Sequence, residues 1–477
     1  MGADIGILAI GSSKGLSLSI FILSILFSSV LLYNVIDRLG GIEIIGRTMT
    51  RLVGGPLAQA LVVGWAFSGF MQGVAGFGVP VAVVTPLLVF MGFRPVKAAA
   101  IVLVGHAWAV SFGSLGSSFY TLTLMTGIPT DEIGPHKALL LALPTLLSGL
   151  AVAHIQGGTS AIRKGAIAIF VMSFAMACST WLMSYFGIPQ VASIASGLLG
   201  CTVGWVIIRV GLLRDSAERD TLSTTQTNSA KYPRYQFHLM FLPYYLVVLL
   251  SFLSQVPAVK ELGTTWYLGL NYPETETALG FVTAEQEGYA RIKLFGHPAP
   301  LILTALLISY LTYRAMGLWV AGTAISAFRQ TYKQSMPSGV GVATMIMMAI
   351  VMSDVGMTTL LGKAIGQSTS VIFPILSPFM GMLGTFLTGS NTSSNIMFGA
   401  LQTEIASSLG IDMVTIAATQ SISGGISSAI APAKVLVGTT VVGLSGRENE
   451  VLRKTVPYCI AITIMLGLQA WIFVHVF

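Results

Sequence analysis

Two stretches rich in glycine and hydroxyl side chains interrupt otherwise apolar sequence, one in each half of the chain. The first spans 69–80 and reads GFMQGVAGFGVP, and the second spans 384–395 and reads GTFLTGSNTSSN. Lipid cannot hydrogen-bond the backbone, so non-helical backbone at membrane depth persists only where protein or water surrounds it. A matched pair of such interruptions predicts a transporter with internal repeats, which binds its substrate where the interruptions meet.

The composition excludes a soluble globular protein. Hydrophobic residues make up 54% of the 477 residues, charged residues make up 9%, and the mean hydropathy is +0.81, whereas soluble domains carry about 25% charged residues. The first apolar run is too long for a cleavable signal peptide, and no small-residue cleavage pattern follows it. We therefore expect an all-α polytopic membrane protein embedded in a lipid bilayer. The apolar runs long enough to span it lie at about 16–36, 138–156, 165–184, 191–208, 237–256, 299–314, 338–354 and 456–477.

The net charge of +7 does not indicate nucleic-acid binding, because the basic residues lie in short loops between apolar runs. The positive-inside rule places these loops in the cytoplasm and leaves the acidic segment 257–298 outside. Three cysteines, Cys178, Cys201 and Cys459, lie inside apolar runs without metal-ligand spacing. Neither a disulfide framework, a metal site nor a cofactor is therefore predicted.

The chain divides into two halves around a polar segment rich in serine and threonine. Counting crossings between the basic loops places two re-entrant hairpins on opposite faces of the membrane, which is the pattern of two inverted repeats, each with a hairpin and a broken transmembrane helix. The predicted segments are a first repeat (1–211) with a hairpin at about 56–91 and a broken helix at about 98–127, a polar cytoplasmic linker (212–236), and a second repeat (237–477) with an outer loop (257–298), a hairpin at about 370–409 and a broken helix at about 413–445.

The outer loop carries four aromatic residues, Trp266, Tyr267, Tyr272 and Tyr289. Amphipathic rings of this kind commonly lie at the membrane–water interface. An aromatic belt is therefore the favoured interpretation, and a lid over the substrate site is the alternative.

At both interruptions and at Ala429-Ile430-Ala431-Pro432, the sequence resembles the L-lactate permease family, from about residue 15 to the carboxyl end. The resemblance implies a prokaryotic transporter of lactate and related short 2-hydroxy acids such as glycolate, coupled to protons and built from inverted repeats with re-entrant hairpins. Members of the family usually carry about two further amino-terminal spans. The start of this sequence is therefore expected to be truncated relative to the family.

Two positions depart from the family pattern. Gln72 stands where the family often has glutamate, and Asn391 stands where it often has aspartate, in Gly-Ser-Asp-Thr-Ser-Ser-Asn. A carboxamide cannot carry a proton. If either acid carries the proton in the family, coupling in this chain must use another residue, another ion or none.

A small carboxylate needs hydrogen-bond donors and positive potential, which half-helix amino termini and hydroxyl groups provide. Lys434 follows the second helix break between apolar segments, where a lysine costs about 2.5–3.5 kcal/mol on insertion scales. The alternative is that the glycines only allow close helix packing and that the lysine pairs with a buried acid or carbonyl. The predicted substrate-binding residues are Gly76, Phe77, Gly78, Gly389, Ser390, Asn391, Thr392, Ser393, Ser394 and Lys434.

Three residues are candidates for ion coupling. Asp354, at the end of an apolar run, is the best remaining acid for carrying a proton or for pairing with Lys434, although a role at the helix end is the alternative. His106 precedes the first helix break and titrates near neutral pH, but it can also be a neutral histidine bonded to a neighbouring helix. Gln72 completes the set through its place in the first interruption.

These observations predict a secondary transporter that imports L-lactate, D-lactate or glycolate, with protons, across a prokaryotic plasma (inner) membrane. A permease for another organic anion, or a sodium-coupled carrier, is the first alternative. A membrane-embedded enzyme is the second, and the lack of a His-Glu-x-x-His sequence or a nucleotide-binding loop argues against it. Fold-level analogy suggests a homodimer.

Overall fold

A computed structural model describes residues 2–51, 53–76, 78–213 and 234–476, most of them helical. Phe77 and most of the predicted linker lie outside the described residues. The helices of the first half are α1 (Ile5–Arg38), α2 (Gly41–Arg51), α3 (Pro56–Gln59), the π-helix η1 (Ala60–Phe67), α4 (Ser68–Val74), α5 (Val79–Phe90), α6 (Pro95–Ala107), the 3-10 helix η2 (Trp108–Phe112), α7 (Ser117–Thr126), α8 (Thr130–Tyr185), η3 (Pro189–Val191) and α9 (Ala192–Val210).

The second half contains helices and two small antiparallel sheets. Its helices are α11 (Arg234–Leu253), α12 (Pro257–Thr265), α13 (Pro298–Ala315), α14 (Thr323–Asp354), α15 (Met357–Thr369), η4 (Ser370–Ile372), α16 (Phe373–Thr388), α17 (Asn391–Leu409), α18 (Met413–Ser427), α19 (Pro432–Thr440) and α20 (Glu448–Val476). Its strands are β1 (Tyr267–Tyr272), β2 (Thr275–Glu276), β3 (Val282–Thr283) and β4 (Gln286–Lys293), with β1 paired to β4 and β2 to β3. The all-α prediction therefore misses only the strands of the outer loop.

Among the described residues, seven helices are long and apolar enough to cross a membrane. The 56-residue helix α8 is interrupted at Gly157 and Gly158, whose non-helical backbone joins two helices end to end. This interruption separates the two apolar runs predicted at 138–156 and 165–184. Glycine at a left-handed φ of 65° explains why the chain bends there, since L side chains disfavour that conformation.

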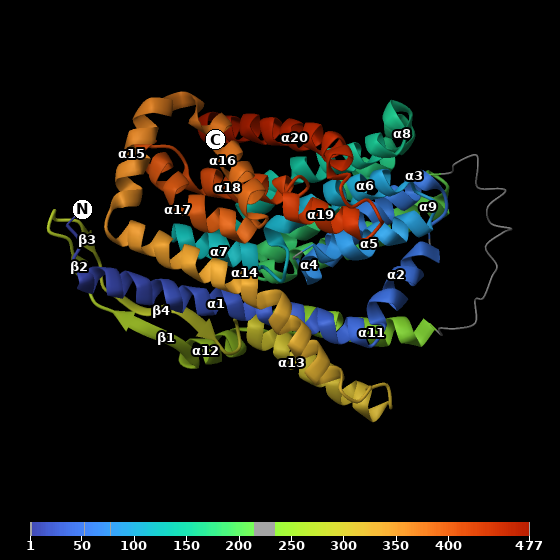
Figure 1. Cartoon of the computed structure of the whole chain (residues 1–477), viewed down its shortest axis with the longest axis horizontal. Coiled ribbons are helices and arrows are strands. Elements are labelled where there is room, and N and C mark those ends of the chain that lie inside the picture. Colours follow the sequence, from blue (N-terminus) through green and yellow to red (C-terminus); the bar gives the residue numbers. More distant parts are fainter. Residues whose placement is uncertain (1, 52, 77, 214–233, 477) are drawn as a thin grey trace.

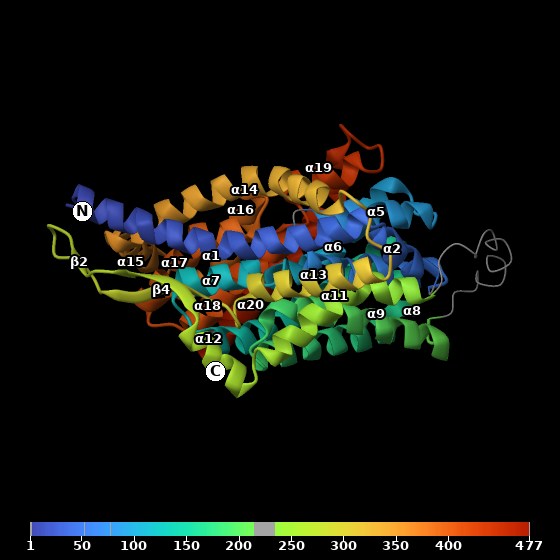
Figure 2. The same cartoon turned by 90° about the horizontal axis from the view of Figure 1, so that it is seen from below.

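The long helices run roughly parallel along the molecule (Figure 1). The segment α3, η1 and α4 leads inward from one end, and α5 packs back against it, while α16 and α17 pack against each other towards the opposite end, where β2 and β3 also lie. The view from below places α5 and α17 at opposite ends as well (Figure 2). The two interruptions of the sequence are thus turns between packed helices that enter the molecule from different ends.

The strands of the outer loop pack beside α1. The Tyr272 hydroxyl lies within hydrogen-bond distance of Ser13 Oγ (3.1 Å) and Ser17 Oγ (2.7 Å). Trp266 and Tyr267 are exposed, whereas Tyr272 is buried. Tyr272 therefore fastens β1 to α1 and contributes no exposed ring to a belt or a lid.

Candidate functional site

The first interruption is a turn, and it is held by residues 113–116, which break the helical segment α6–α7 between η2 and α7. Helix α4 ends at Val74, and α5 starts after Gly78, whose φ is +81°. The Ser114 and Leu115 amides donate to the Gln72 and Gly73 carbonyls at 2.8 and 2.9 Å. The last carbonyls of α4, which a helix end leaves without intrahelical partners, are satisfied in this way. Both donors have a φ of 51°, a left-handed conformation that non-glycine residues rarely adopt.

The second interruption joins α16 to α17 through two residues. Gly389 ends α16 with a φ of +75°, and Ser390 caps α17 by accepting a hydrogen bond from the Ser393 amide at 3.3 Å. Serine is a preferred cap because its oxygen satisfies an amide that the first turn leaves free. At this turn the negative carboxyl end of the α16 dipole therefore lies beside the positive amino end of α17.

Both turns lie against α19, the short helix that follows the second helix break. A Cβ added to Gly389 would lie 3.3 Å from the Ala433 Cβ, and a Cβ added to Gly78 would lie 3.5 Å from Val437 Cγ1. Lys434 lies between these two contact points in the first turn of α19. The structure therefore packs Gly78 and Gly389 against the helix that carries Lys434.

Lys434 is a buried lysine, with a relative exposure of 7%. Among the residues that the structure describes, no carboxylate forms an ion pair with it. His106 lies near enough to interact electrostatically with Lys434, and its ring donates through Nδ1 to the Val102 carbonyl at 2.8 Å. Its Nε2 is 3.5 Å from Ser428 Oγ, so His106 joins α6 to the break before α19.

Two asparagines of α17, Asn391 and Asn395, hydrogen-bond to neighbouring helices near the second turn. Asn391 Nδ2 donates to Ser118 Oγ at 2.7 Å. Asn395 Nδ2 donates to the Ser118 carbonyl at 2.9 Å and to Ser421 Oγ at 3.1 Å. Ser118 belongs to α7 and Ser421 to α18, so these amides connect the second turn to both broken helices.

The remaining predicted residues occupy different positions around the turns. The Ser394 hydroxyl is occupied within the protein, because it donates to the Gly381 carbonyl at 2.9 Å and accepts from Gln420 Nε2 at 3.0 Å. Thr392 is buried. Gly76 is also buried, and any Cβ there would clash with Ser114 Oγ.

Asp354 pairs with a residue other than the predicted one. Asp354 is the last residue of α14, and its Oδ2 lies 3.1 Å from Nζ of Lys14 in α1. The prediction that Asp354 pairs with Lys434 is therefore wrong, because α1 packs along α14 and presents its own buried lysine there. Lys14 gave a weak signal in the sequence, since it lies before the first apolar run and near the start of the chain.

Lys137 is a second residue that sequence reasoning missed. It is fully buried near the start of α8, and its Nζ donates to the Ser111 carbonyl at 2.8 Å and to Ser421 Oγ at 2.9 Å. The residue directly precedes the apolar run at 138–156 and follows Asp131 and Glu132 closely, so in sequence it resembles an interfacial lysine. The only sequence feature that could have indicated its burial is its position at the border of an apolar run.

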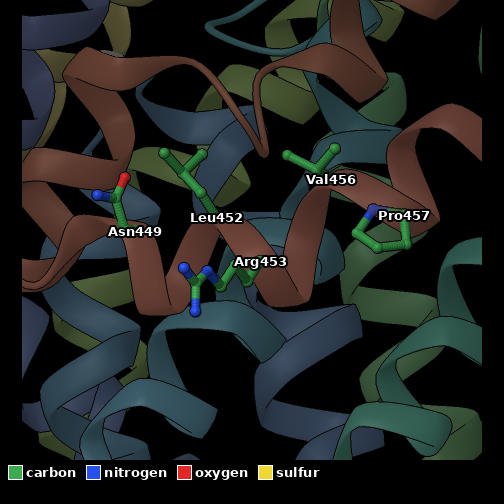
Figure 3. Close-up of a pocket in the computed structure, with 5 residues that line it drawn as sticks. All are labelled: Asn449, Leu452, Arg453, Val456 and Pro457. Carbon is green, nitrogen blue, oxygen red and sulfur yellow. The ribbon is translucent and has the colours of Figure 1, made fainter.

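A pocket on the surface of α20 lies apart from the two turns. Figure 3 shows its lining residues on the first turns of that helix, and none of them belongs to either interruption or to a helix break. They are Asn449, Leu452, Arg453, Val456 and Pro457.

Comparison with solved structures finds membrane transporters. The YdaH transporter of Alcanivorax borkumensis has a TM-score of 0.43 and 17% sequence identity, and the match covers 99% of this chain and 85% of that one. MtrF of Neisseria gonorrhoeae has a TM-score of 0.47 and 12% identity, covering 98% of this chain and 84% of that one.

Curated relatives are permeases rather than enzymes. The L-lactate permease of Escherichia coli K12 is 28% identical over 471 residues, which cover 94% of this chain and 84% of the relative. The L-lactate permease of Bacillus subtilis 168 is 28% identical over 483 residues, which cover 95% and 84%. The glycolate permease GlcA of Escherichia coli K12 is 25% identical over 486 residues, which cover 94% and 84%.

The family model described as L-lactate permease matches residues 5–477. Together with the apolar helices, these bacterial relatives identify a multi-pass protein of the bacterial inner membrane. Because the match extends over nearly the whole chain, the protein belongs to the L-lactate permease family.

Proposed function

We propose that this protein imports L-lactate and related short 2-hydroxy monocarboxylates, including D-lactate and glycolate, together with protons. The observation that carries the proposal is that both turns, at Gly78 and Gly389, pack against α19, the helix that carries the buried Lys434. Family membership and the glycolate permease relative support the substrate class. A lysine buried without a carboxylate is costly, and a bound monocarboxylate supplies the missing negative charge.

The chemistry of the turn suits a small anion. The substrate carboxylate would interact with Lys434 Nζ and with the positive amino end of α17, where the Thr392 amide belongs to the first turn. The 2-hydroxyl group of the substrate would bond to neighbouring side chains such as Asn391. One anion held between a lysine and a helix amino terminus is released more readily than one held by several fixed cations, as a carrier requires.

We also propose that the two halves are inverted repeats. The segments α3–α5 and α16–α17 would be re-entrant hairpins that enter from opposite faces, and α6–α7 and α18–α19 would be the broken helices. In this arrangement the amino terminus and the outer loop lie outside, and the ends that hold α3 and α9 lie in the cytoplasm. The substrate would bind near the bilayer midplane, where hairpin turns meet helix breaks.

Uptake of radiolabelled L-lactate into proteoliposomes, under an inward proton gradient, tests the function. The Lys434→Met variant should lose at least about 30-fold in apparent lactate affinity, because removing one partner of a buried charge pair costs about 2 kcal/mol or more. Lys363→Met, which removes an exposed lysine of α15, should leave uptake unchanged. Parental affinity in Lys434→Met would remove the lysine from the site, and no lactate uptake by the parent would refute the substrate assignment.

A sodium-coupled carrier is the second candidate, and one observation favours it. A Cβ added to Gly424 would clash with Asn391 Oδ1 and would lie 2.9 Å from Thr385 Oγ1, and both oxygens belong to buried residues. Neither oxygen has a hydrogen-bond partner in the described part of the chain. Neutral oxygens beside the carboxyl end of a half-helix, here α16, are the ligands that sodium uses in transporters of this kind.

Thermal unfolding of the purified protein in NaCl and in KCl separates the two coupling ions. A sodium site predicts a higher Tm in NaCl, with the increase lost in Thr385→Val. Thr419→Val is the matched control, because Thr419 is equally buried but its hydroxyl donates to the Thr415 carbonyl of its own helix. Equal Tm values in both salts, with uptake driven by protons alone, would exclude sodium coupling.

A further inference from the structure

Lys137 is a buried lysine that the proposed substrate contacts leave unused. Its side chain has a relative exposure of 0% and extends from α8 between the two broken helices. Its Nζ donates to the Ser111 carbonyl of η2 at 2.8 Å and to Ser421 Oγ of α18 at 2.9 Å. The rings of Phe112 and Phe119 lie 4.6 and 5.2 Å from Nζ.

No carboxylate pairs with Lys137 in the part of the chain that the structure describes. The elements that touch its side chain, η2, α7 and α18, contain no Asp, Glu, Lys, Arg or His. Four titratable side chains on α7 and the adjoining helices bond to other groups: His106 to Val102, Tyr120 to Gln190, His136 to Thr415 and Cys459 to Ile426. The acids of the adjoining helices are Asp131 and Glu132 at the start of α8, Asp412 capping α18, Glu404 of α17, and Glu448 and Glu450 of α20. None of them forms an ion pair with Lys137 among the described residues. A buried ammonium without a carboxylate is costly, and such groups commonly exist as the neutral amine instead.

Both charge states of Lys137 fit the observed contacts. An ammonium has three N–H donors, and a neutral amine has two. The two hydrogen bonds to Ser111 and Ser421 therefore survive loss of the third proton, and the facing aromatic rings stabilise the charged form when it is present. The group can gain and lose a proton without breaking either hydrogen bond.

A chain of hydrogen bonds connects Lys137 to the second turn. Ser421 Oγ accepts from Lys137 Nζ and also from Asn395 Nδ2, at 3.1 Å. Asn395 and Asn391 in turn both donate to Ser118. A change of charge at Lys137 thus acts on the shared Ser421 hydroxyl and reaches the α17 side chains beside the proposed substrate position.

We propose that Lys137 binds the coupled proton. The proposal rests on the proposed proton-coupled uptake of lactate, and it assigns the proton to a residue other than Gln72 and Asn391, whose carboxamides cannot carry one. One proton from the outer water binds the Nζ lone pair when the lactate anion binds, and the same proton leaves Nζ for the inner water after the anion is released. One positive and one negative charge cross together, so no net charge moves.

Proteoliposomes that contain a pH-sensitive dye test this role, because two reactions can be compared. Lactate exchange between labelled and unlabelled pools requires substrate binding and movement but no net proton transfer. Lactate-driven proton uptake requires substrate binding and movement and, in addition, net proton transfer. Lys137→Met should retain exchange and lose lactate-driven proton uptake. Lys137→Arg, whose guanidinium is not deprotonated in proteins, should show the same separation, whereas a purely structural cation would be rescued by arginine.

Lys97→Met is the matched control. Lys97 also donates to a backbone carbonyl, that of Gln156, at 2.8 Å, but it lies outside the chain of bonds to α17. It should retain both reactions. Parental proton uptake in Lys137→Met, rescue by arginine, or equal loss of exchange and proton uptake in Lys137→Met would each overturn the proposal. A parent that exchanges lactate without taking up protons would overturn it together with proton coupling, and a parent that exchanges no lactate would refute the substrate assignment first.

Discussion

The two turns of the molecule are built from different chemistry. At the first, backbone groups make the contacts, because the Ser114 and Leu115 amides bond to carbonyls of α4. At the second, side chains make them, through Asn391 and Asn395 of α17. Gln72 contributes its backbone carbonyl to the first turn, while its Oε1 has no hydrogen-bond partner among the described residues.

This difference indicates at which turn the identity of the side chains matters for transport. Backbone contacts fix a position but are insensitive to side-chain changes that preserve the fold. Side-chain amides link the second turn to Ser118 and Ser421, so chemical changes there alter the relation between the hairpin and both broken helices. We therefore expect substitutions at the second turn to affect transport more than equivalent substitutions at the first.

Of the substitutions that compare the two turns, Asn395→Leu is expected to have the largest effect. Asn395→Leu removes the donor to the Ser118 carbonyl and Ser421, and a buried group left without a partner costs about 1–3 kcal/mol. Apparent lactate affinity should fall by roughly 5- to 150-fold, measured by uptake into proteoliposomes. Gln72→Leu is the matched change at the first turn and should have a much smaller effect. Equal losses in the two variants would contradict the proposed division between backbone and side-chain turns.

A smaller effect is expected when an acid is placed at each turn. Asn391→Asp replaces the donor to Ser118 with a carboxylate that repels a substrate anion. Uptake at alkaline pH should therefore fall, and it should recover as the pH is lowered, because the protonated carboxyl regains a donor. Gln72→Glu leaves the backbone contacts of the first turn in place and should respond less to pH. A pH profile steeper in Gln72→Glu than in Asn391→Asp would reverse the comparison.

The sequence located the turns because glycine and hydroxyl clusters contrast with apolar surroundings. Gly78 and Gly389 both occupy left-handed conformations at helix ends, as a turn between helices requires. Lys434 was also visible, since a lysine flanked by apolar residues is expensive in a membrane. These features are local, and a single sequence displays them.

The partners of buried charges were not predictable in the same way. Lys14 and Asp354 pair only because α1 lies along α14, and their positions are 340 residues apart. Lys137 borders an apolar run, so only the packing of α8 against η2 and α18 shows that it is buried. Ser118 was visible as part of a break, but its bonds to α17 depend on tertiary contacts.

The smallest expected effect comes from adding a single methyl group at each turn, where the two positions differ in the room they leave for it. Gly78→Ala and Gly389→Ala both place a side chain at a positive φ, which costs roughly 1–2 kcal/mol, so both should lower the Tm of the purified protein. A Cβ at position 389 also presses on Ala433 at 3.3 Å, whereas one at position 78 meets Val437 at an ordinary 3.5 Å. Displacing Ala433 moves the neighbouring Lys434, so only Gly389→Ala should also weaken lactate affinity, by about two- to fivefold for 0.5–1 kcal/mol. Equal affinities in the two variants, at equally lowered Tm, would show that the contact between the second turn and α19 does not set the position of the lysine.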